Sequence, residues 1–448
     1  MAGKWEEISL ATVMEVKHGF AFPGENIRDE PPGDILLTPG NFAIGGGFKG
    51  DKFKYFDGEV PEDYVLKEGE LVLTMTDLSQ QADTLGYPAI VPKPRDSRFL
   101  HNQRLGKVLV KPGAELDPGF LFYLLRTAEY RNEVLASATG TTVKHTSPGR
   151  ILAHKARIPP LAVQKAIAVI LQSLDDKIEL NRRMNATLEA TARALFQSWF
   201  VDFDPVRAKL DGRKPIGLDS ATADLFPDSF YESTLGPIPL GWEVCPLSKK
   251  IQLLSGGTPK TAEPAYWDGD IPWYSVRDAP SETDVWVIHT EKHVTKLGIA
   301  NSAAQVFPVK TTIISARGTV GKLALTAVPM AMNQSCYGVR GITGYGDYFT
   351  YYSLREATAQ LQQRTHGTVF DTITTETFKT LDCNFPTPII TAAFDKIVEP
   401  FLGQICANLH QSRTLATLRD TLLPKLLSGE IRPPEAANRA TNREVEHA

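Results

Sequence analysis

The sequence predicts an α+β protein made of two similar parts, each a mixed, mainly antiparallel sheet domain with helices, followed by a long helix. Three observations support this fold class. Short motifs recur in the same order in the two halves of the chain. Runs rich in Val, Ile, Thr and aromatic residues alternate with Gly and Pro turns. After each of these regions, apolar residues recur every three or four positions, which is typical of an amphipathic helix.

The length of 448 residues exceeds one ordinary domain, and 42% hydrophobic with 22% charged residues is normal for a globular protein. The four cysteines lie far apart, which disfavours a disulfide framework or a zinc site. Neither a signal peptide nor a membrane span is predicted. We therefore expect a cytoplasmic protein with no membrane partner.

Charge is unevenly distributed along the chain. The net charge is −4, yet residues 93–157 contain twelve Lys and Arg against five Asp and Glu. Such a local basic face is compatible with DNA binding when partner subunits supply further phosphate contacts. The alternative is that the basic run is ordinary solvated surface.

The two halves are related by matched motifs, and the offset between them falls from 237 to 227 residues along the chain. This drift is expected if loops changed length while the order of elements stayed the same. Matched pairs include Trp5 and Trp242, Gly19 and Gly256, Asn102-Gln103 and Asn333-Gln334, FLFYLLR (120–126) and FTYYSLR (349–355), and Gly140-Thr141 and Gly367-Thr368.

Each copy is predicted to contain short strands followed by one helix. The strands are expected at 69–76, 88–91 and 105–110 in the first copy, and at 310–316 and 322–328 in the second. The helices are expected from Asp117 to about Ala136, and from Gly346 to about Thr365.

Two longer helices follow the sheet domains. Pro400 and Pro424 are expected to kink or end the second one locally. A helix of about 38 residues is unstable alone, so we expect the pair to form an antiparallel coiled coil. That arrangement would place the sheet domains at opposite ends, related by a pseudo-twofold axis. The alternative is two separate core helices.

These patterns divide the chain into six segments. We expect a first recognition domain (1–157), a central long helix (158–200), a linker (201–240), a second recognition domain (241–388), a distal long helix (389–430) and a flexible tail (431–448). Two similar binding domains on a rigid spacer predict recognition of two half-sites on one DNA duplex. Because the domains differ in sequence, the half-sites should differ, which gives an asymmetric bipartite target.

The helical segments also resemble a known family. LDDKIELNRRMNATLEATARALFQSWFVDFDPV (174–206) is similar to the central conserved region of type I restriction–modification specificity subunits. LRDTLLPKLLSGEIR (418–432) resembles their distal conserved region, and FPDSFYESTLGPIPLGWE (226–243) resembles the segment that leads into their second target-recognition domain.

This resemblance implies a subunit that recognises double-stranded DNA and does no chemistry itself. It implies two methyltransferase subunits as partners, which modify adenine N6 with S-adenosylmethionine, and restriction subunits that translocate DNA with ATP and Mg. It implies that the conserved helices bind the methyltransferase subunits. No cofactor or metal is expected on this chain.

The sequence offers no convincing catalytic site. The Pro-Pro of residues 29–33 lacks the Asn/Asp-Pro-Pro-Tyr/Phe pattern of an amino-methyltransferase. RGTVGK (317–322) lacks the spacing of a phosphate-binding loop, and we interpret it as a turn between strands. His289 and His293 lack the zincin order, and we interpret them as surface residues.

Candidate DNA contacts are loop side chains that can pair with base edges or phosphates. In the first domain they are Lys49, Lys52 and Lys54; Arg98, His101, Asn102, Gln103 and Arg104; and Thr141, Thr142, Lys144 and His145. In the second domain they are Trp273, Ser275 and Arg277; Arg317 and Thr319; Asn333 and Gln334; and Thr368, with Lys260 and Lys322 as phosphate contacts.

Several alternatives stay open at this point. The matched Asn-Gln pairs could hold loops by side-chain-to-backbone hydrogen bonds instead of reading bases. The chain could be a stand-alone bipartite DNA-binding regulator, which would bind DNA tightly without partners. An enzyme with an unrecognised site, such as a DNA hydrolase, would show metal-dependent turnover by the purified chain.

Overall fold

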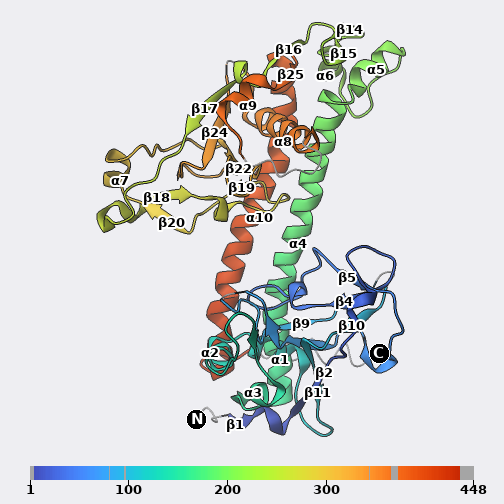
Figure 1. Ribbon diagram of the computed structural model, residues 1–448, viewed down its shortest axis with the longest axis vertical. Helices are drawn as coiled ribbons and strands as arrows, with labels where there is room; N and C mark the ends of the chain where they lie inside the picture. The colour runs from blue at the N-terminus through green and yellow to red at the C-terminus, as the bar shows by residue number, and fades with distance from the viewer. Residues whose placement is uncertain (1–4, 80, 95–96, 343, 365–371, 434–448) are drawn as a thin grey trace. The chain divides into compact units, whose positions relative to one another are not determined.

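The computed structural model describes residues 5–79, 81–94, 97–342, 344–364 and 372–433 (Figure 1). The chain divides into two compact units. Unit 1 comprises Met1–Asp176 and Leu415–Ala448, and unit 2 comprises Lys177–Thr414. Each unit contains one sheet domain and a part of each of two long helices. Within the described residues, no helix combines the length and apolar character needed to cross a membrane.

The two long helices are α4 (Leu161–Phe200) and α10 (Pro388–Ser428). Both were predicted from apolar periodicity. Pro400 and Pro424 were expected to kink or end the second one locally, and neither ends it, because α10 continues through both. An internal proline costs a helix about 3 kcal/mol. Burial of neighbours such as Val398 and Leu402, both fully enclosed in the core, offsets that cost.

Unit 1 is a sheet domain with three short helices. A four-stranded sheet, β2-β11-β7-β9, lies beside a five-stranded one, β3-β5-β4-β10-β6, and β1–β13 and β8–β12 form separate pairs. The strands are β1 (Glu6–Ser9), β2 (Met14–His18), β3 (Ile27–Arg28), β4 (Asp34–Leu37), β5 (Lys54–Phe56), β6 (Val65–Leu66), β7 (Leu71–Thr74), β8 (Thr76–Asp77), β9 (Pro88–Ile90), β10 (Phe99–His101), β11 (Leu105–Val110), β12 (Lys144–His145) and β13 (Lys155–Ile158). The helices are α1 (Pro118–Leu124), α2 (Ala128–Ala136) and α3 (Pro148–Leu152).

The single helix predicted from Asp117 to Ala136 is therefore two helices. Asp117 caps α1 by accepting a hydrogen bond from the Phe120 amide, and Thr127 caps α2 in the same way from Tyr130. A second N-cap in the middle of the segment starts a new helix there.

Unit 2 repeats this plan with a five-stranded sheet, β17-β24-β21-β22-β19, a three-stranded sheet, β20-β18-β23, and the pair β16–β25. The strands are β16 (Glu243–Pro246), β17 (Ile251–Ser255), β18 (Trp267–Tyr274), β19 (Trp286–Val287), β20 (Lys292–Val294), β21 (Thr312–Ser315), β22 (Leu323–Thr326), β23 (Ala331–Met332), β24 (Cys336–Gly341) and β25 (Asp382–Phe385). The helices are α7 (Lys296–Ala300), α8 (Asp347–Arg364) and α9 (Thr375–Thr380).

The sheets are mainly antiparallel, as predicted. Among the described strands, β4–β10, β18–β23 and β19–β22 are parallel, and the other pairs are antiparallel. The repeat is visible in the pairing, since β1–β13, β2–β11 and β4–β10 of unit 1 correspond to β16–β25, β17–β24 and β18–β23 of unit 2. The predicted duplication is thus present as a duplicated sheet topology.

The segment 201–240, expected as a linker, is a folded part of unit 2. It contains α5 (Asp204–Leu210), α6 (Ser220–Asp224) and a hairpin of β14 (Phe230–Ser233) and β15 (Gly236–Pro239). Phe203, Phe226 and Ile238 are buried in the same core cluster as Trp242 and Phe394. This burial explains why the segment forms defined structure between the two repeats.

In unit 2, the α4 part packs antiparallel against the α10 part across a buried polar layer. Asn181 donates to the Gln411 side chain at 2.9 Å and to the Ser412 hydroxyl at 3.1 Å. Asn408 donates to Asn185 at 2.9 Å, and Asn185 donates to Asp284 of the sheet domain at 3.1 Å. A polar layer within an apolar helix interface favours one register, because any slip leaves polar groups unpaired.

In unit 1, the α4 part and the α10 part share the core of the sheet domain. Ile167 and Leu171 of α4 are buried together with Leu423, Leu426 and Leu427 of α10. The core of unit 1 thus depends on chain segments that are far apart in sequence.

Two candidate DNA contacts lie inside the sheets, and those predictions are wrong. His101 is fully buried in β10, with Nε2 3.0 Å from the Leu105 carbonyl oxygen, and burial lowers its pKa to about 4. Trp273 of β18 is 7% exposed and donates from Nε1 to the Gly257 carbonyl at 2.9 Å. Residue type alone does not reveal that His101 Nε2 and Trp273 Nε1 pair with backbone carbonyls inside the sheets. His101 Nδ1 is buried without a hydrogen-bond partner in the described part of the chain.

The buried imidazole predicts a pH dependence of stability. In the unfolded chain His101 binds a proton below a pH of about 6.5, whereas in the folded chain it does so only near pH 4. Between these two pH values the unfolded state binds more protons, so the free energy of unfolding should fall as the pH drops from about 6.5 to about 4. The slope should approach about 1.4 kcal/mol per pH unit. His101→Met, which copies the matched and buried Met332, should remove this slope when unfolding of the full chain is followed by circular dichroism. Equal slopes in the two proteins would contradict the assignment.

The polar layer predicts non-additive substitutions. Asn408→Leu should destabilise the chain by about 1–3 kcal/mol, because the buried Asn185 amide oxygen loses its donor. The double variant Asn185→Leu with Asn408→Leu should cost less than the sum of the single changes. Urea unfolding of the four proteins measures this coupling, and simple additivity would show that the two side chains act independently.

Candidate DNA interface

Four loops of unit 2 meet at one edge of its sheets. They follow β17 (256–260), β18 (275–279), β21 (316–322) and β23 (333–335). The Gly257 amide donates to the Met332 carbonyl at 2.9 Å, the Asn333 amide to Tyr274 at 2.9 Å and the Ala316 amide to Ser335 at 2.8 Å. We call this edge the four-loop surface of unit 2.

Unit 1 has an equivalent surface with the same hydrogen-bond framework. The Phe20 amide donates to the His101 carbonyl at 2.8 Å, as Gly257 does to Met332. The Met75 amide donates to Arg104 at 2.9 Å, as Ala316 does to Ser335. Its loops are 19–23, 38–48, 75–79 with 81–84, and 102–104, and the hairpin 139–145 lies beside them.

A further pair of hydrogen bonds extends this match. In unit 1 the Thr146 amide donates to Met75 at 3.0 Å, and in unit 2 the Ile373 amide donates to Ala316 at 3.0 Å. The segments that precede Thr146 and Ile373 were both predicted to contact DNA. Of these, Thr368 lies outside the described residues, so its prediction stays untested.

Close packing of a glycine against an asparagine fixes the first loop in each unit. A Cβ on Gly19 would lie 2.0 Å from the Asn102 carbonyl oxygen, and a Cβ on Gly256 would lie 2.0 Å from that of Asn333. No side chain fits at these distances, so both positions require glycine.

The matched asparagines also hold their loops internally. Asn102 accepts a hydrogen bond from the Arg104 amide at 2.9 Å, and Asn333 accepts one from the Ser335 amide at 3.0 Å. This is the local side-chain-to-backbone pattern of an Asx turn. The structural alternative for the matched asparagines is therefore supported, while the neighbouring Gln103 and Gln334 are exposed.

The structure brings together several exposed candidates on each four-loop surface. In unit 1, Gln103 and Arg104 are joined through Met75 and Thr146 to the hairpin that carries the exposed Thr141, Thr142 and His145 and the half-buried Lys144. In unit 2, Lys260, Arg277, Arg317, Thr319, Lys322 and Gln334 are exposed on the converging loops. These side chains can offer donors and acceptors to a duplex without rearrangement of the sheets. Gln334 is engaged by a neighbouring loop, since its amide oxygen accepts a hydrogen bond from the Thr258 hydroxyl.

Residues 317–322 form a turn between β21 and β22, as interpreted from the sequence. The Ser315 hydroxyl donates to the Thr319 carbonyl and accepts from the Lys322 amide at 2.8 Å. The turn is thereby fixed to its own strand, with the Arg317 and Lys322 side chains exposed.

Other candidates have structural partners. Arg98 donates hydrogen bonds to both carboxylate oxygens of Asp34, and it donates to Glu62 at 2.9 Å. The hydrogen bonds and charge of Asp34 raise the pKa of Arg98 above its usual range. Lys54 of β5 forms an ion pair with Asp29, and Lys49 lies 3.3 Å from Asp51. Lys52 is exposed and has no ion-pair partner in the described part of the chain. Among these, Lys52 is the most available to a phosphate.

Ser275 belongs to a local cap that has a counterpart in the first repeat. Ser275 donates to the Asp278 carboxylate at 2.9 Å, as Thr38 donates to the Asn41 amide oxygen at 3.1 Å. The loop 273–278 therefore corresponds to the chain around Thr38–Asn41.

Sequence reasoning missed the loop formed by residues 77–79 and 81–84. The Asp77 carboxylate accepts hydrogen bonds from the Ser79 amide at 2.7 Å and from Thr84; burial alone would raise its pKa, but these bonds lower it. The buried Arg131 of α2 donates to the backbone carbonyls of Leu85 and Ala82. The loop carries Leu78, which is 62% exposed. The available signal was an Asp followed two residues later by Ser, which favours an Asx turn.

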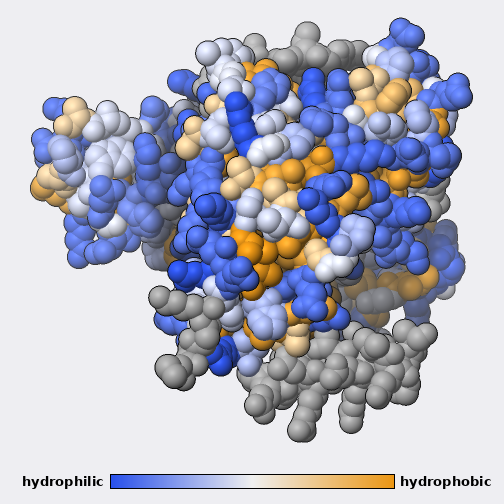
Figure 2. Space-filling model, turned by 90° about the horizontal axis from the view of Figure 1, so that it is seen from below, coloured by the Kyte–Doolittle hydropathy of each residue, from blue (hydrophilic) through white to orange (hydrophobic). Residues whose placement is uncertain are grey.

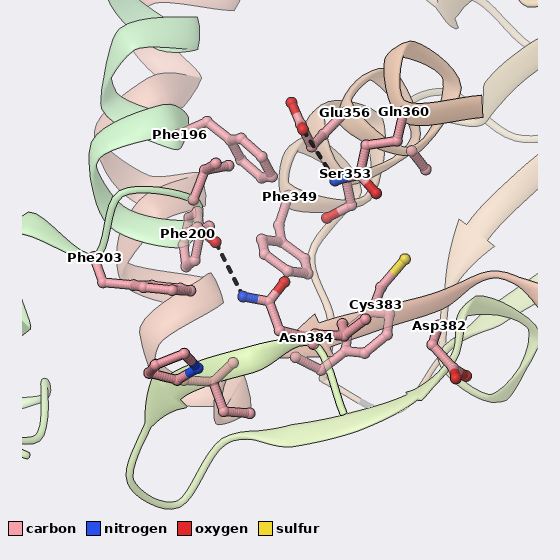
Figure 3. Close-up of a pocket in the computed structure, with 16 residues that line it drawn as sticks. Phe196, Phe200, Phe203, Phe349, Ser353, Glu356, Gln360, Asp382, Cys383 and Asn384 are labelled. Carbon is pink, nitrogen blue, oxygen red and sulfur yellow. Dashed lines mark hydrogen bonds between the residues drawn. The ribbon is translucent and has the colours of Figure 1, made fainter. Parts of the chain in front are cut away.

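Each unit also has a groove in a matched position. The groove of unit 2, about 310 Å³, lies between the end of α4, β25 and α8, and is lined by Phe196 and Phe200 (Figure 3). Asn384 donates to the Phe200 carbonyl at 3.1 Å at its edge (Figure 3). The segment 235–238 lines the other side.

The groove of unit 1, about 620 Å³, lies between the end of α10, β13 and α1–α2. Leu423 and Leu427 take the places of Phe196 and Phe200, at an offset of 227 residues. Seen from below Figure 1, apolar side chains gather at the centre of the molecular face, with hydrophilic side chains around them (Figure 2). Apolar surface that borders a polar rim is typical of protein interfaces.

Comparisons with known proteins agree with this architecture. A family model for the type I restriction modification DNA specificity domain matches residues 2–190 and 239–410. The HindI specificity subunit of Haemophilus influenzae is 30% identical over 72% of this chain and 80% of its own length. The MjaIX specificity subunit of Methanocaldococcus jannaschii is 25% identical over 78% of this chain and 76% of its own length.

Among solved structures, the type I restriction–modification S subunit from M. genitalium superposes with a TM-score of 0.56 at 15% identity, covering 95% of this chain and 97% of that one. This similarity supports the fold. The two family-model matches coincide with the two repeats seen in the sheets and loops. The chain belongs to the family of type I restriction–modification DNA specificity subunits.

Proposed function

We propose that this chain recognises an asymmetric, bipartite DNA sequence, with one half-site read by each unit. The observation that carries the proposal is that one hydrogen-bond framework presents different side chains in the two units. A shared framework would place both loop surfaces against a duplex in the same way. Different side chains would then select different bases.

The exposed side chains supply the required chemistry. Arginine pairs with two acceptors of guanine, and glutamine pairs with adenine. Unit 1 offers Gln103 and Arg104 next to each other, whereas in unit 2 Gln334 is followed by Ser335 and an arginine comes from the β21 loop as Arg317. Lys52, Lys260 and Lys322 are suited to phosphates, which position the protein without reading sequence.

The matched grooves support two copies of one partner. A protein with two grooves in matched positions can hold two identical subunits, one at each groove. We propose that these are methyltransferase subunits and that restriction subunits join this core. S-adenosylmethionine, ATP and Mg would be bound by those partners, and this chain would be non-catalytic and act on DNA in the cytoplasm. The relatives named above are specificity subunits of type I restriction enzymes.

The direct test is to map N6-methyladenine across the genome of cells that express the methyltransferase partner, with and without this chain. We expect one interrupted, asymmetric motif that depends on the chain. Methylation that is unchanged by removal of the chain would contradict the proposal. Tight, sequence-specific binding by the chain alone, without any methylation, would favour the stand-alone regulator.

Substitution of the exposed arginines should affect one half-site at a time. Arg104→Ala should weaken binding by about tenfold and relax base preference in the half-site read by unit 1, because one bidentate base contact is worth about 1–3 kcal/mol. Arg317→Ala should do the same for the other half-site. Competition binding with duplexes that carry the mapped motif, or single-base changes in it, measures both effects.

The matched control is Arg213→Ala. Arg213 is exposed and paired with Asp211 in the segment between the repeats, and it belongs to neither four-loop surface. It should leave affinity and motif unchanged. If Arg104→Ala and Arg317→Ala alter the same base positions, the assignment of one half-site to each unit is wrong.

A further inference from the structure

A buried arginine of unit 1 joins the long helix to a loop of the sheet domain. Arg126 follows α1, and its side chain is 9% exposed. Its Nη1 donates to Asp175 of α4 at 2.8 Å, and its Nε donates to the Gly45 carbonyl at 2.7 Å. A Cβ on Gly46 would lie 2.9 Å from the Arg126 side chain, so the loop tip packs directly on the arginine.

The carboxylate at the centre of this contact is strongly held. Asp175 also accepts from the Tyr123 hydroxyl at 2.9 Å and from Arg419 of α10. Burial acts to raise the pKa of Asp175, but Arg126 and Arg419 hold it below its usual range. The anchor therefore stays charged and ties both long helices of unit 1 to one side chain.

In unit 2 the matched arginine also joins α4 to a loop of the sheet domain. Arg355 of α8 occupies the place of Arg126 in the repeated motif, FTYYSLR against FLFYLLR. Its Nη1 donates to Glu189 of α4 at 2.8 Å, and its Nη2 donates to Glu282 at 3.3 Å. Burial raises the pKa of Glu189 against the effect of Arg355, which shows the cost of enclosing this carboxyl.

The loops that the two arginines hold are also equivalent. Gly45 lies seven residues after the Thr38 cap, and Glu282 lies seven residues after the Ser275 cap. The carboxylates differ (Asp175 and Glu189), as do the loop acceptors, a carbonyl in one unit and a carboxylate in the other. The repeats share an arginine that joins α4 to the loop after the cap. The details differ, because the loop is reached from Nε of Arg126 but from Nη2 of Arg355.

We propose that Arg126 and Arg355 are positioning residues, each of which fixes the loop after β4 or β18 against the long helix and so sets the base preference of its own half-site. This inference rests on the proposed function. The loop held by Arg126 leads directly to Lys49 and Lys52, and the loop held by Arg355 follows the cap that carries Arg277. Small displacements of such loops change which base edges they reach.

Lysine variants separate positioning from stability. A lysine in place of Arg126 would keep a charge near Asp175, but a single ammonium lacks the planar fork that reaches Asp175 and Gly45 together. Arg126→Lys should therefore retain the thermal stability of the full chain and lose about tenfold of base discrimination in one half-site. Arg355→Lys should do so in the other half-site, and Arg126→Gln and Arg355→Gln should show larger losses in the same half-sites.

The control is Arg340→Gln, which breaks the 3.2 Å ion pair with Asp347 without touching α4 or either held loop. It should leave the motif unchanged. The experiment maps N6-methyladenine in cells that express each variant with the methyltransferase partner, and scores methylation at motif sites that carry one altered base in either half. Thermal unfolding of the purified variants is measured in parallel.

Three results would overturn the inference. A single variant could relax both half-sites equally, the glutamine variants could keep full discrimination, or the lysine variants could match the wild type in specificity. Each would show that the arginines act on the scaffold as a whole or only on stability. A wild-type chain that directs no methylation motif would instead contradict the proposed function, so the two failures are distinguishable.

Discussion

The close approach of a glycine to the backbone of an asparagine loop is the constraint on which each recognition surface depends. At Gly19 and Gly256 the space for a Cβ is already filled by a carbonyl oxygen. This contact brings the loop after β2 against the loop that carries Gln103 in unit 1, and the loop after β17 against the loop that carries Gln334 in unit 2. The remaining loops are joined to that pair by backbone hydrogen bonds, so the geometry of the surface is set by main-chain atoms.

This division between main chain and side chain lets the two repeats diverge. Backbone hydrogen bonds place few demands on residue type, whereas glycine and capping residues are required at a few points. Thr38 with Asn41 and Ser275 with Asp278 form the same cap from different residues. Most exposed positions between these points have no structural role in common, so their side chains differ without loss of the fold; the matched Gln103 and Gln334 are an exception.

The scaffold was more predictable from the sequence than the surface it presents. Apolar periodicity located α4 and α10, because a helix that buries one face leaves a regular pattern. The prolines in α10 do not end the helix, since burial of neighbours such as Leu402 offsets the local cost of a proline. His101 and Trp273 were placed on the surface because their chemistry suits DNA, yet the sheet encloses them. Burial of a polar side chain depends on distant strands, which local sequence does not describe.

The composition of the two units has a consequence for how the chain folds during synthesis. Unit 1 contains the first 176 residues but completes its core with Leu423, Leu426 and Leu427 of α10. Arg419 reaches Asp175 from the same late segment. The first sheet domain is therefore synthesised early, but the apolar face that packs against α10 stays exposed to solvent until the chain beyond residue 415 has left the ribosome. Unit 2 lies wholly within the intervening chain, so it can close first, although it begins later in the sequence.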